Sequence, residues 1–106
     1  MASIQDFQKL ELRVAEILEV SPHPSADRLY VLKIRVGEVQ KQIVAGIRLH
    51  YQPAELVGKR IVVVNNLEPA VIRGVESNGM LLAASNEEKL TLVVPERDIP
   101  SGAQVR

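Results

Sequence analysis

Three cations of this 106-residue chain have the spacing of a binding surface for a polyanion. Lys33 and Arg35 alternate with apolar residues along one expected strand, and Lys41 lies in the strand that follows a Gly-Glu turn. Since alternate residues of a strand share a face, we expect these side chains together on the outer face of a hairpin. Cations in such an arrangement hold phosphate groups. A solvated sheet face is the alternative explanation of the same pattern.

A polar turn between two glycines supplies the second group of candidate residues. Gly74 and Gly79 mark backbone that needs a positive φ or a close approach, and the segment between them leads into an apolar run. Its short hydroxyl and amide groups can hydrogen-bond to riboses or bases. The candidate contacts on this side are Asn66, Arg73, Ser77, Asn78 and Met80. An ordinary hairpin connection is the alternative, and for Asn66 a strand end held by bonds to the backbone.

Catalytic and metal-binding chemistry has little support in the sequence. His23 and His50 are 27 positions apart with no partner at ligand spacing, and cysteine is absent. Glu87 and Glu88 lie in a turn context, where a solvated surface is the default. The glycine-bracketed turn lacks the lysine and the following helix of a P-loop. We therefore expect a protein that is non-catalytic by itself and holds no metal or cofactor.

Length and composition indicate one domain with an aliphatic core. The residues are 46% hydrophobic but include only three aromatics, which favours strands of Val, Ile and Leu over a helical bundle. The net charge is zero, yet residues 28–60 carry seven basic and two acidic groups, net +5, which favours a local anionic partner. The N-terminus lacks a signal segment, and no uncharged run approaches the length of a membrane span. We expect a soluble, cytoplasmic protein with no membrane partner.

The expected elements place both candidate groups on one small β-barrel. We expect a short capped helix after Ser3, a long bent strand over 12–20, a loop over 21–27 and a hairpin over 29–46. A short helix from Pro53, a strand over 60–65, a loop over 67–79, strands over 80–84 and 90–94, and an irregular tail follow.

This order of elements predicts an all-β fold, a five-stranded OB-fold Greek-key barrel with short helices and a C-terminal extension. It forms a single domain over residues 1–106. An SH3-like or other small barrel is the alternative. In an OB fold, ligands lie on the second and third strands and between two loops, which here are 21–27 and 66–79.

Several blocks of the sequence, in the same order, resemble the tRNA-binding domain family. The blocks are Asp6 to Ile17, His23 to Tyr30, Val44 to Ile47, Asn66 to Pro69 and Gly74 to Ala84. The family comprises stand-alone bacterial tRNA-binding proteins, the C-terminal domain or β-subunit of methionyl-tRNA synthetase, and the endothelial-monocyte-activating polypeptide II class. Tyr51 and the segment from Pro53 to Gly58 also match, and the resemblance extends over nearly the whole chain.

The resemblance implies an OB-fold homodimer that binds the outer corner of the L-shaped tRNA with little sequence preference. It implies that Ser77 and Met80 belong to the RNA-contacting loop, with Asn66 and Arg73 nearby. It also implies an accessory role, delivering tRNA to an aminoacyl-tRNA synthetase, with a methionyl-tRNA synthetase catalytic chain as a candidate partner. An export-type chaperone that binds unfolded polypeptides is the alternative, although the loop of such relatives departs from the Gly-Val-Glu-Ser-Asn-Gly-Met pattern present here.

Overall fold

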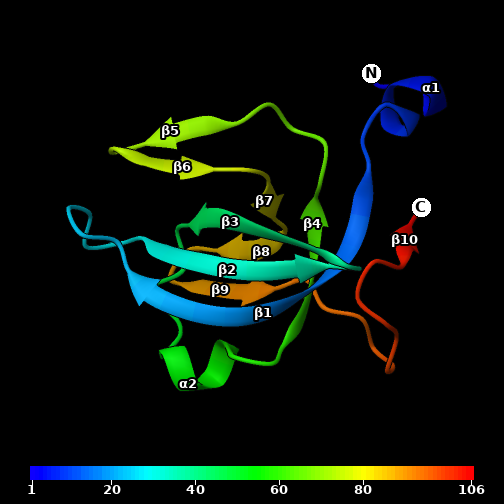
Figure 1. Ribbon diagram of the computed structural model, residues 1–106. Helices are drawn as coiled ribbons and strands as arrows, with labels where there is room; N and C mark the ends of the chain where they lie inside the picture. Colours follow the sequence, from blue (N-terminus) through cyan, green and yellow to red (C-terminus); the bar gives the residue numbers. More distant parts are fainter.

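A curled sheet of aliphatic strands forms the frame of the protein, and the computed structural model describes all residues, 1–106 (Figure 1). The main sheet contains β1 (Leu12–Pro22), β2 (Tyr30–Val36), β3 (Val39–Ala45), β4 (Arg60–Val64), β7 (Met80–Leu81) and β10 (Gln104–Val105). Two hairpins are formed by β5 (Ala70–Ile72) with β6 (Val75–Ser77) and by β8 (Ala83–Asn86) with β9 (Lys89–Leu92). The two helices are α1 (Ile4–Gln8) and α2 (Pro53–Leu56).

The long strand β1 gives the sheet its curvature. Its first half pairs with β4 over residues 12–16, and its second half pairs with β2 over residues 16–22. The register shifts between Ile17 and Glu19, which is the bulge that the slip in apolar phase predicts. Because one bent strand serves two neighbours, the order β3-β2-β1-β4-β7 curls into a half-barrel. The expected all-β, OB-type fold is confirmed.

The interior of the barrel is filled by branched aliphatic side chains from every long strand. Ile17, Ile34, Ile43 and Ile61 are each at most 1% exposed. Leu56 of α2 is fully buried against them, and Figure 1 shows α2 at one end of the barrel. Burial of such a side chain contributes about 1.5–3 kcal/mol. The core is therefore aliphatic, as the composition predicts.

Both helices begin where the sequence predicts. Ser3 and Asp6 form a reciprocal capping box, in which the Ser3 hydroxyl accepts from the Asp6 N–H at 3.1 Å. Pro53 begins α2, and Gly58, with a φ of 87°, follows its end. Neither helix is long and apolar enough to cross a membrane.

The second half of the chain differs from the sequence prediction in three places. The expected loop over 67–79 contains the β5–β6 hairpin, the expected strand over 80–84 is divided at Leu82, and the expected irregular tail contains β10. The hairpin turn is formed by Arg73 and Gly74, both with positive φ (51° and 87°). Strands of two or three residues carry no visible periodicity, so pairing with distant partners decides them.

Candidate nucleic-acid interface

The loop over 23–29 and the β5–β6 turn meet at one end of the barrel. The Arg73 guanidinium donates from Nη2 to the Ser25 carbonyl at 2.9 Å, and the Ser25 hydroxyl donates to the Arg73 carbonyl at 3.4 Å. The buried imidazole of His23 lies 2.9 Å from the Ile72 carbonyl through Nε2. These are the two loops that an OB fold uses to hold its ligands. The two loops that the sequence predicts on the ligand-binding side of the barrel are therefore in contact with each other.

Three arginines surround this junction. Arg28 and Arg73 line a hollow of about 420 Å³ together with Asp27. Arg48 joins them from the turn after β3, because its Nη1 donates to the Ala26 carbonyl at 3.3 Å. Arg28 is exposed and Arg48 half-buried. One acid against three cations leaves this end of the barrel positive, which favours an anionic ligand.

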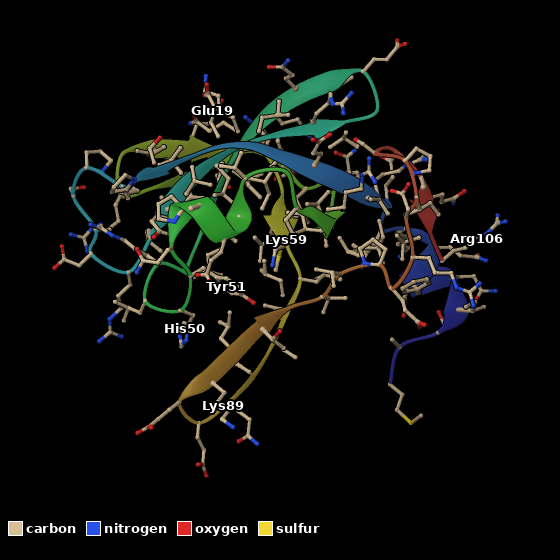
Figure 2. All side chains as sticks on the ribbon, turned by 90° about the horizontal axis from the view of Figure 1, so that it is seen from below. Glu19, His50, Tyr51, Lys59, Lys89 and Arg106 are labelled. Atoms are coloured by element: carbon tan, nitrogen blue, oxygen red, sulfur yellow. The ribbon has the colours of Figure 1, made fainter.

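The strand face that carries Lys33 and Arg35 is less basic than expected. Arg35 forms an ion pair with Glu16 of β1, and Glu19 lies directly opposite Lys33 in the β1–β2 register. Figure 2 shows Glu19 on the outside of the sheet. Both acids come from residues 1–27, so they lie outside the net-positive segment 28–60 and its charge of +5 does not include them. Lys33 is exposed and has no ion-pair partner. Of the two cations on this face, only Lys33 is therefore unpaired and open to a ligand, as the sequence predicts.

Lys41 does not share the face of Lys33 and Arg35, and that prediction is wrong. In the β2–β3 register Lys41 lies opposite the core residue Ile34, so it is on the inner face of the sheet. Its ammonium group donates to the carbonyl and the side-chain oxygen of Asn65, at 2.8 and 2.9 Å. The two-residue turn of Gly37 and Glu38 pairs Val36 with Val39, and this register brings Lys41 opposite Ile34 on the inner face.

The two asparagines of the expected loop surface are held by the protein itself. The Asn66 side chain accepts from the Glu11 N–H and donates to the Lys9 carbonyl, both at 2.8 Å. These bonds fasten α1 to the end of β4. They correspond to the alternative explanation of Asn66 as a residue that ends a strand by bonding to the backbone. Asn78 donates its backbone N–H to the Gln42 carbonyl at 2.8 Å, and its side chain remains half-exposed.

Ser77 is buried, with 3% of its surface exposed. Its hydroxyl accepts from the Val44 N–H at 2.9 Å and donates to the Gly79 carbonyl at 3.0 Å. These bonds, with the one from Asn78, bridge the gap between β3 and β7 that the half-barrel leaves open. A Cβ on Gly79 would lie 2.9 Å from the Val64 carbonyl oxygen, so the strand approaches too closely for a side chain. The sequence predicts an RNA contact at Ser77, and the structure shows its hydroxyl buried and bonded within the protein.

Met80 lies on a different surface from Arg73. It is 48% exposed and ends a row of directly opposed apolar residues on the outer face of the sheet. The row runs across β7, β4, β1 and β10 through Met80, Val64, Leu12 and Val105. Figure 1 shows β7 at the opposite end of the β5–β6 hairpin from its turn. The expected RNA-contacting loop is therefore divided between the two surfaces.

The β8–β9 hairpin extends away from the barrel and is attached to it near Tyr51 (Figure 2). The Tyr51 hydroxyl accepts from the Leu92 N–H at 3.1 Å, and this bond lowers the pKa of Tyr51 below its usual value of 10.0. Lys59 lies over the Tyr51 ring, 5.3 Å from its centre. No group of three acidic, histidine or cysteine side chains is arranged to hold a metal ion.

Sequence reasoning missed three residues of the loop junction, namely His23, Arg28 and Arg48. In the sequence, His23 lies in the expected loop over 21–27 without a partner at ligand spacing, and the two arginines belong to the positive segment 28–60. Arg28 directly follows the predicted loop, which was a usable signal. Arg48 lies in a turn between β3 and α2 whose path the sequence does not specify.

An OB-type barrel with a positive loop junction belongs to the class of small nucleic-acid-binding domains. The model of the family described as "Putative tRNA binding domain" matches residues 12–104. The chain therefore belongs to the tRNA-binding domain family.

Relatives and solved structures agree with this membership. The chain is 49% identical over 104 residues to a methionine–tRNA ligase of Thermococcus kodakarensis and 50% identical over 103 residues to one of Caldanaerobacter subterraneus. These matches cover 98% and 97% of the chain but 14% and 16% of the ligases, so the chain spans about one seventh of their length.

Two solved structures match over the whole chain. A MetRS-related protein from Pyrococcus horikoshii has a TM-score of 0.92 at 32% identity, with 98% of that chain covered. The chaperone CsaA of Bacillus anthracis has a TM-score of 0.90 at 30% identity, with 99% of that chain covered. The shared barrel thus occurs in proteins with different names and roles.

Proposed function

We propose that this chain is a tRNA-binding module that recognises the outer corner of the folded tRNA by shape and charge, with little sequence preference. Family membership supports the proposal, and one observation carries it: Arg28, Arg48 and Arg73 surround the junction of the two loops. Guanidinium groups bind phosphates in bidentate geometry. Three of them on a neutral protein concentrate positive charge where the fold places its ligands.

The aromatic residues support recognition of shape over sequence. Tyr30 is buried, with its hydroxyl donating to the Tyr51 carbonyl at 2.7 Å, and the Tyr51 ring lies beneath Lys59. Phe7 belongs to α1, which lies at the end of the molecule away from the β5–β6 turn (Figure 1). Sequence-specific reading of unpaired RNA relies on stacking bases against exposed rings. A junction without such rings contacts phosphates and riboses, which are the same in every tRNA.

The proposed contacts come from the loop junction and the adjoining strand. Arg73, Lys33 and Asn78 remain from the sequence prediction, and Arg28 and Arg48 are added. Arg35 contributes less because Glu16 neutralises it. Lys41, Asn66 and Ser77 act by holding the barrel and its loops in place.

We further propose that the chain acts as a homodimer through the apolar row that ends at Met80. The row is flanked by the exposed apolar residues Phe7 and Leu10 near the N-terminus, since Asn66 fastens this segment to the end of β4. Leu12 and Val64 of the row are already buried, so the apolar area that a second copy would remove from water comes from Met80, Phe7 and Leu10. Replacing Met80 by Asp is expected to give monomers by light scattering, whereas Val71→Asp, on the exposed hairpin strand β5, leaves the dimer intact. A monomeric wild-type protein refutes this part.

The role proposed for the module is to deliver tRNA to a synthetase. The relatives that match it are methionine–tRNA ligases, of which it spans about one seventh. A linked or bound module raises the local tRNA concentration at the catalytic chain, so weak affinity suffices. Adding the module to a methionyl-tRNA synthetase catalytic chain should lower the KM for tRNA and leave kcat unchanged.

A gel-shift titration tests the RNA-binding proposal directly. Folded tRNA should bind more tightly than duplex DNA or an unstructured RNA of equal length, and its affinity should fall steeply as salt rises. Arg73→Ala should weaken binding and reduce the salt slope by about one. Arg97→Ala removes the same charge from the exposed C-terminal segment and serves as the matched control. Equal affinity for folded and unstructured RNA refutes recognition by shape.

A chaperone that binds unfolded polypeptides is the second candidate function. The observation in its favour is the likeness to CsaA over the whole of both chains. If this is the function, the protein should suppress aggregation of a denatured client at stoichiometric amounts and leave tRNA unbound. Suppression that Met80→Asp abolishes while Arg73→Ala does not would assign it to the apolar row.

A further inference from the structure

His23 is a buried polar side chain at the point where the two loops meet. It is 3% exposed, and it follows directly after β1. Its Nδ1 accepts from the Ser25 N–H at 3.0 Å, and its Nε2 lies 2.9 Å from the Ile72 carbonyl oxygen. One ring therefore joins its own loop to the strand that leads into the turn of Arg73.

The neighbouring backbone groups define the tautomer of His23. A backbone N–H can only donate, so Nδ1 must be unprotonated to accept from Ser25. A carbonyl can only accept, so Nε2 must carry the proton that it donates to Ile72. Both ring nitrogens are used by the neutral imidazole, and neither is left free for a metal ion or a ligand.

We propose that His23 is a positioning residue for RNA binding, which sets the place of Arg73 relative to Arg28. This inference rests on the function proposed above. Without the His23–Ile72 bond, the β5–β6 turn is held to the loop only by Ser25 and Arg73, through an exposed bond at 3.4 Å and one at 2.9 Å. Both of those bonds are made by Arg73 itself, one through its backbone carbonyl and one through its guanidinium group. His23 is thus the residue that holds the turn by a bond that does not involve Arg73. The turn would then move relative to the hollow, and the guanidinium would lose its fixed direction.

An imidazole suits this task because its donor and acceptor sit on different atoms of a rigid ring. The side-chain oxygen of Asn can take the place of Nδ1 as the acceptor from Ser25, but its amide is too short to reach Ile72. The longer side chain of Gln can bring its NH₂ group to the place of Nε2 and donate to Ile72. The bond that joins the loops is the outer one, from Nε2 to Ile72. A positioning role therefore predicts that Gln, and not Asn, restores RNA binding.

The test compares His23→Ala, His23→Asn and His23→Gln in tRNA gel shifts over a range of salt concentrations. We expect His23→Ala and His23→Asn to bind about tenfold more weakly, with a salt slope reduced by about one, as for the loss of one phosphate contact. His23→Gln should bind within about threefold of wild type. The exposed His50→Gln is the matched control and should bind like wild type.

Three outcomes overturn the inference, and each can be told apart from a failure of the proposed function. Folded His23→Ala with wild-type affinity and slope removes the positioning role, as does equal rescue by Asn and Gln. If the variants do not fold, nitrogen NMR of the wild-type ring decides, and a proton on Nδ1 refutes the bonding scheme. Wild-type protein that does not bind tRNA refutes the proposed function instead, whatever the NMR result.

Discussion

Replacing Ser77 by Ala tests whether the half-barrel is closed by one hydroxyl group. The substitution leaves the Val44 N–H without a partner in a buried position, since Val44 is 7% exposed. An orphaned buried donor costs about 1–3 kcal/mol, and the lost bond to the Gly79 carbonyl adds about 1 kcal/mol. The free energy of unfolding should therefore fall by about 2–4 kcal/mol.

Urea and thermal denaturation measure this loss. A domain of this size loses about 4–8 °C of Tm per kcal/mol, so the Tm should fall by at least about 8 °C. Ser85→Ala, on the exposed strand β8, is the control and should change stability by less than about 0.5 kcal/mol. Equal stability of Ser77→Ala and wild type would refute the closure. Below its Tm, Ser77→Ala should bind tRNA with unchanged affinity, and a weaker affinity at an unchanged salt slope would restore Ser77 as an uncharged RNA contact.

Three further predictions follow from single contacts. Gly79→Ala should destabilise the protein by more than about 2 kcal/mol in urea denaturation, because the new Cβ meets the Val64 carbonyl oxygen at 2.9 Å and φ is 132°. Glu16→Gln should raise tRNA affinity roughly threefold and steepen the salt dependence in gel shifts, because it releases the charge of Arg35. Hydrogen bonds from the N-cap serine lower the pKa of Asp6 below 3.8, so its contribution to α1 is complete above that pH and is lost as pH falls through the lowered pKa, as NMR of the helix amides can follow.

Each of these predictions has a matched control. Gly58→Ala also places a side chain at positive φ, but with nothing within 4 Å, so it should cost only about 1 kcal/mol. Glu96→Gln removes the same charge from the C-terminal segment and should leave RNA affinity unchanged. Asp6→Asn should abolish the acid transition of the helix, and a transition that persists would assign it to another group.

The long elements and the fold class could be predicted because their signals are local. Alternation along 29–36, the bend of the strand over 12–20, the capping residues of both helices and the proline at the start of α2 are all visible in the sequence. Each was found where expected. The short strands β5, β6 and β10 were missed, because a two- or three-residue strand exists only through its partner.

The candidate site was predicted in part, for a related reason. The sequence alone determined which loops and which charges the protein has. The alternation of apolar residues locates the strands and the loops between them, and the charged residues can be counted directly. Only the tertiary structure decided which charges are free, because Glu16 of β1 pairs with Arg35 of β2 while Lys33 forms no ion pair. It also turned Lys41 and Ser77 inward and brought Arg28, Arg48 and Arg73 to one junction. Strand register and loop contacts join residues that are far apart in the chain. The interactions that stabilise them form only in the closed barrel, so no local pattern in the sequence predicts them.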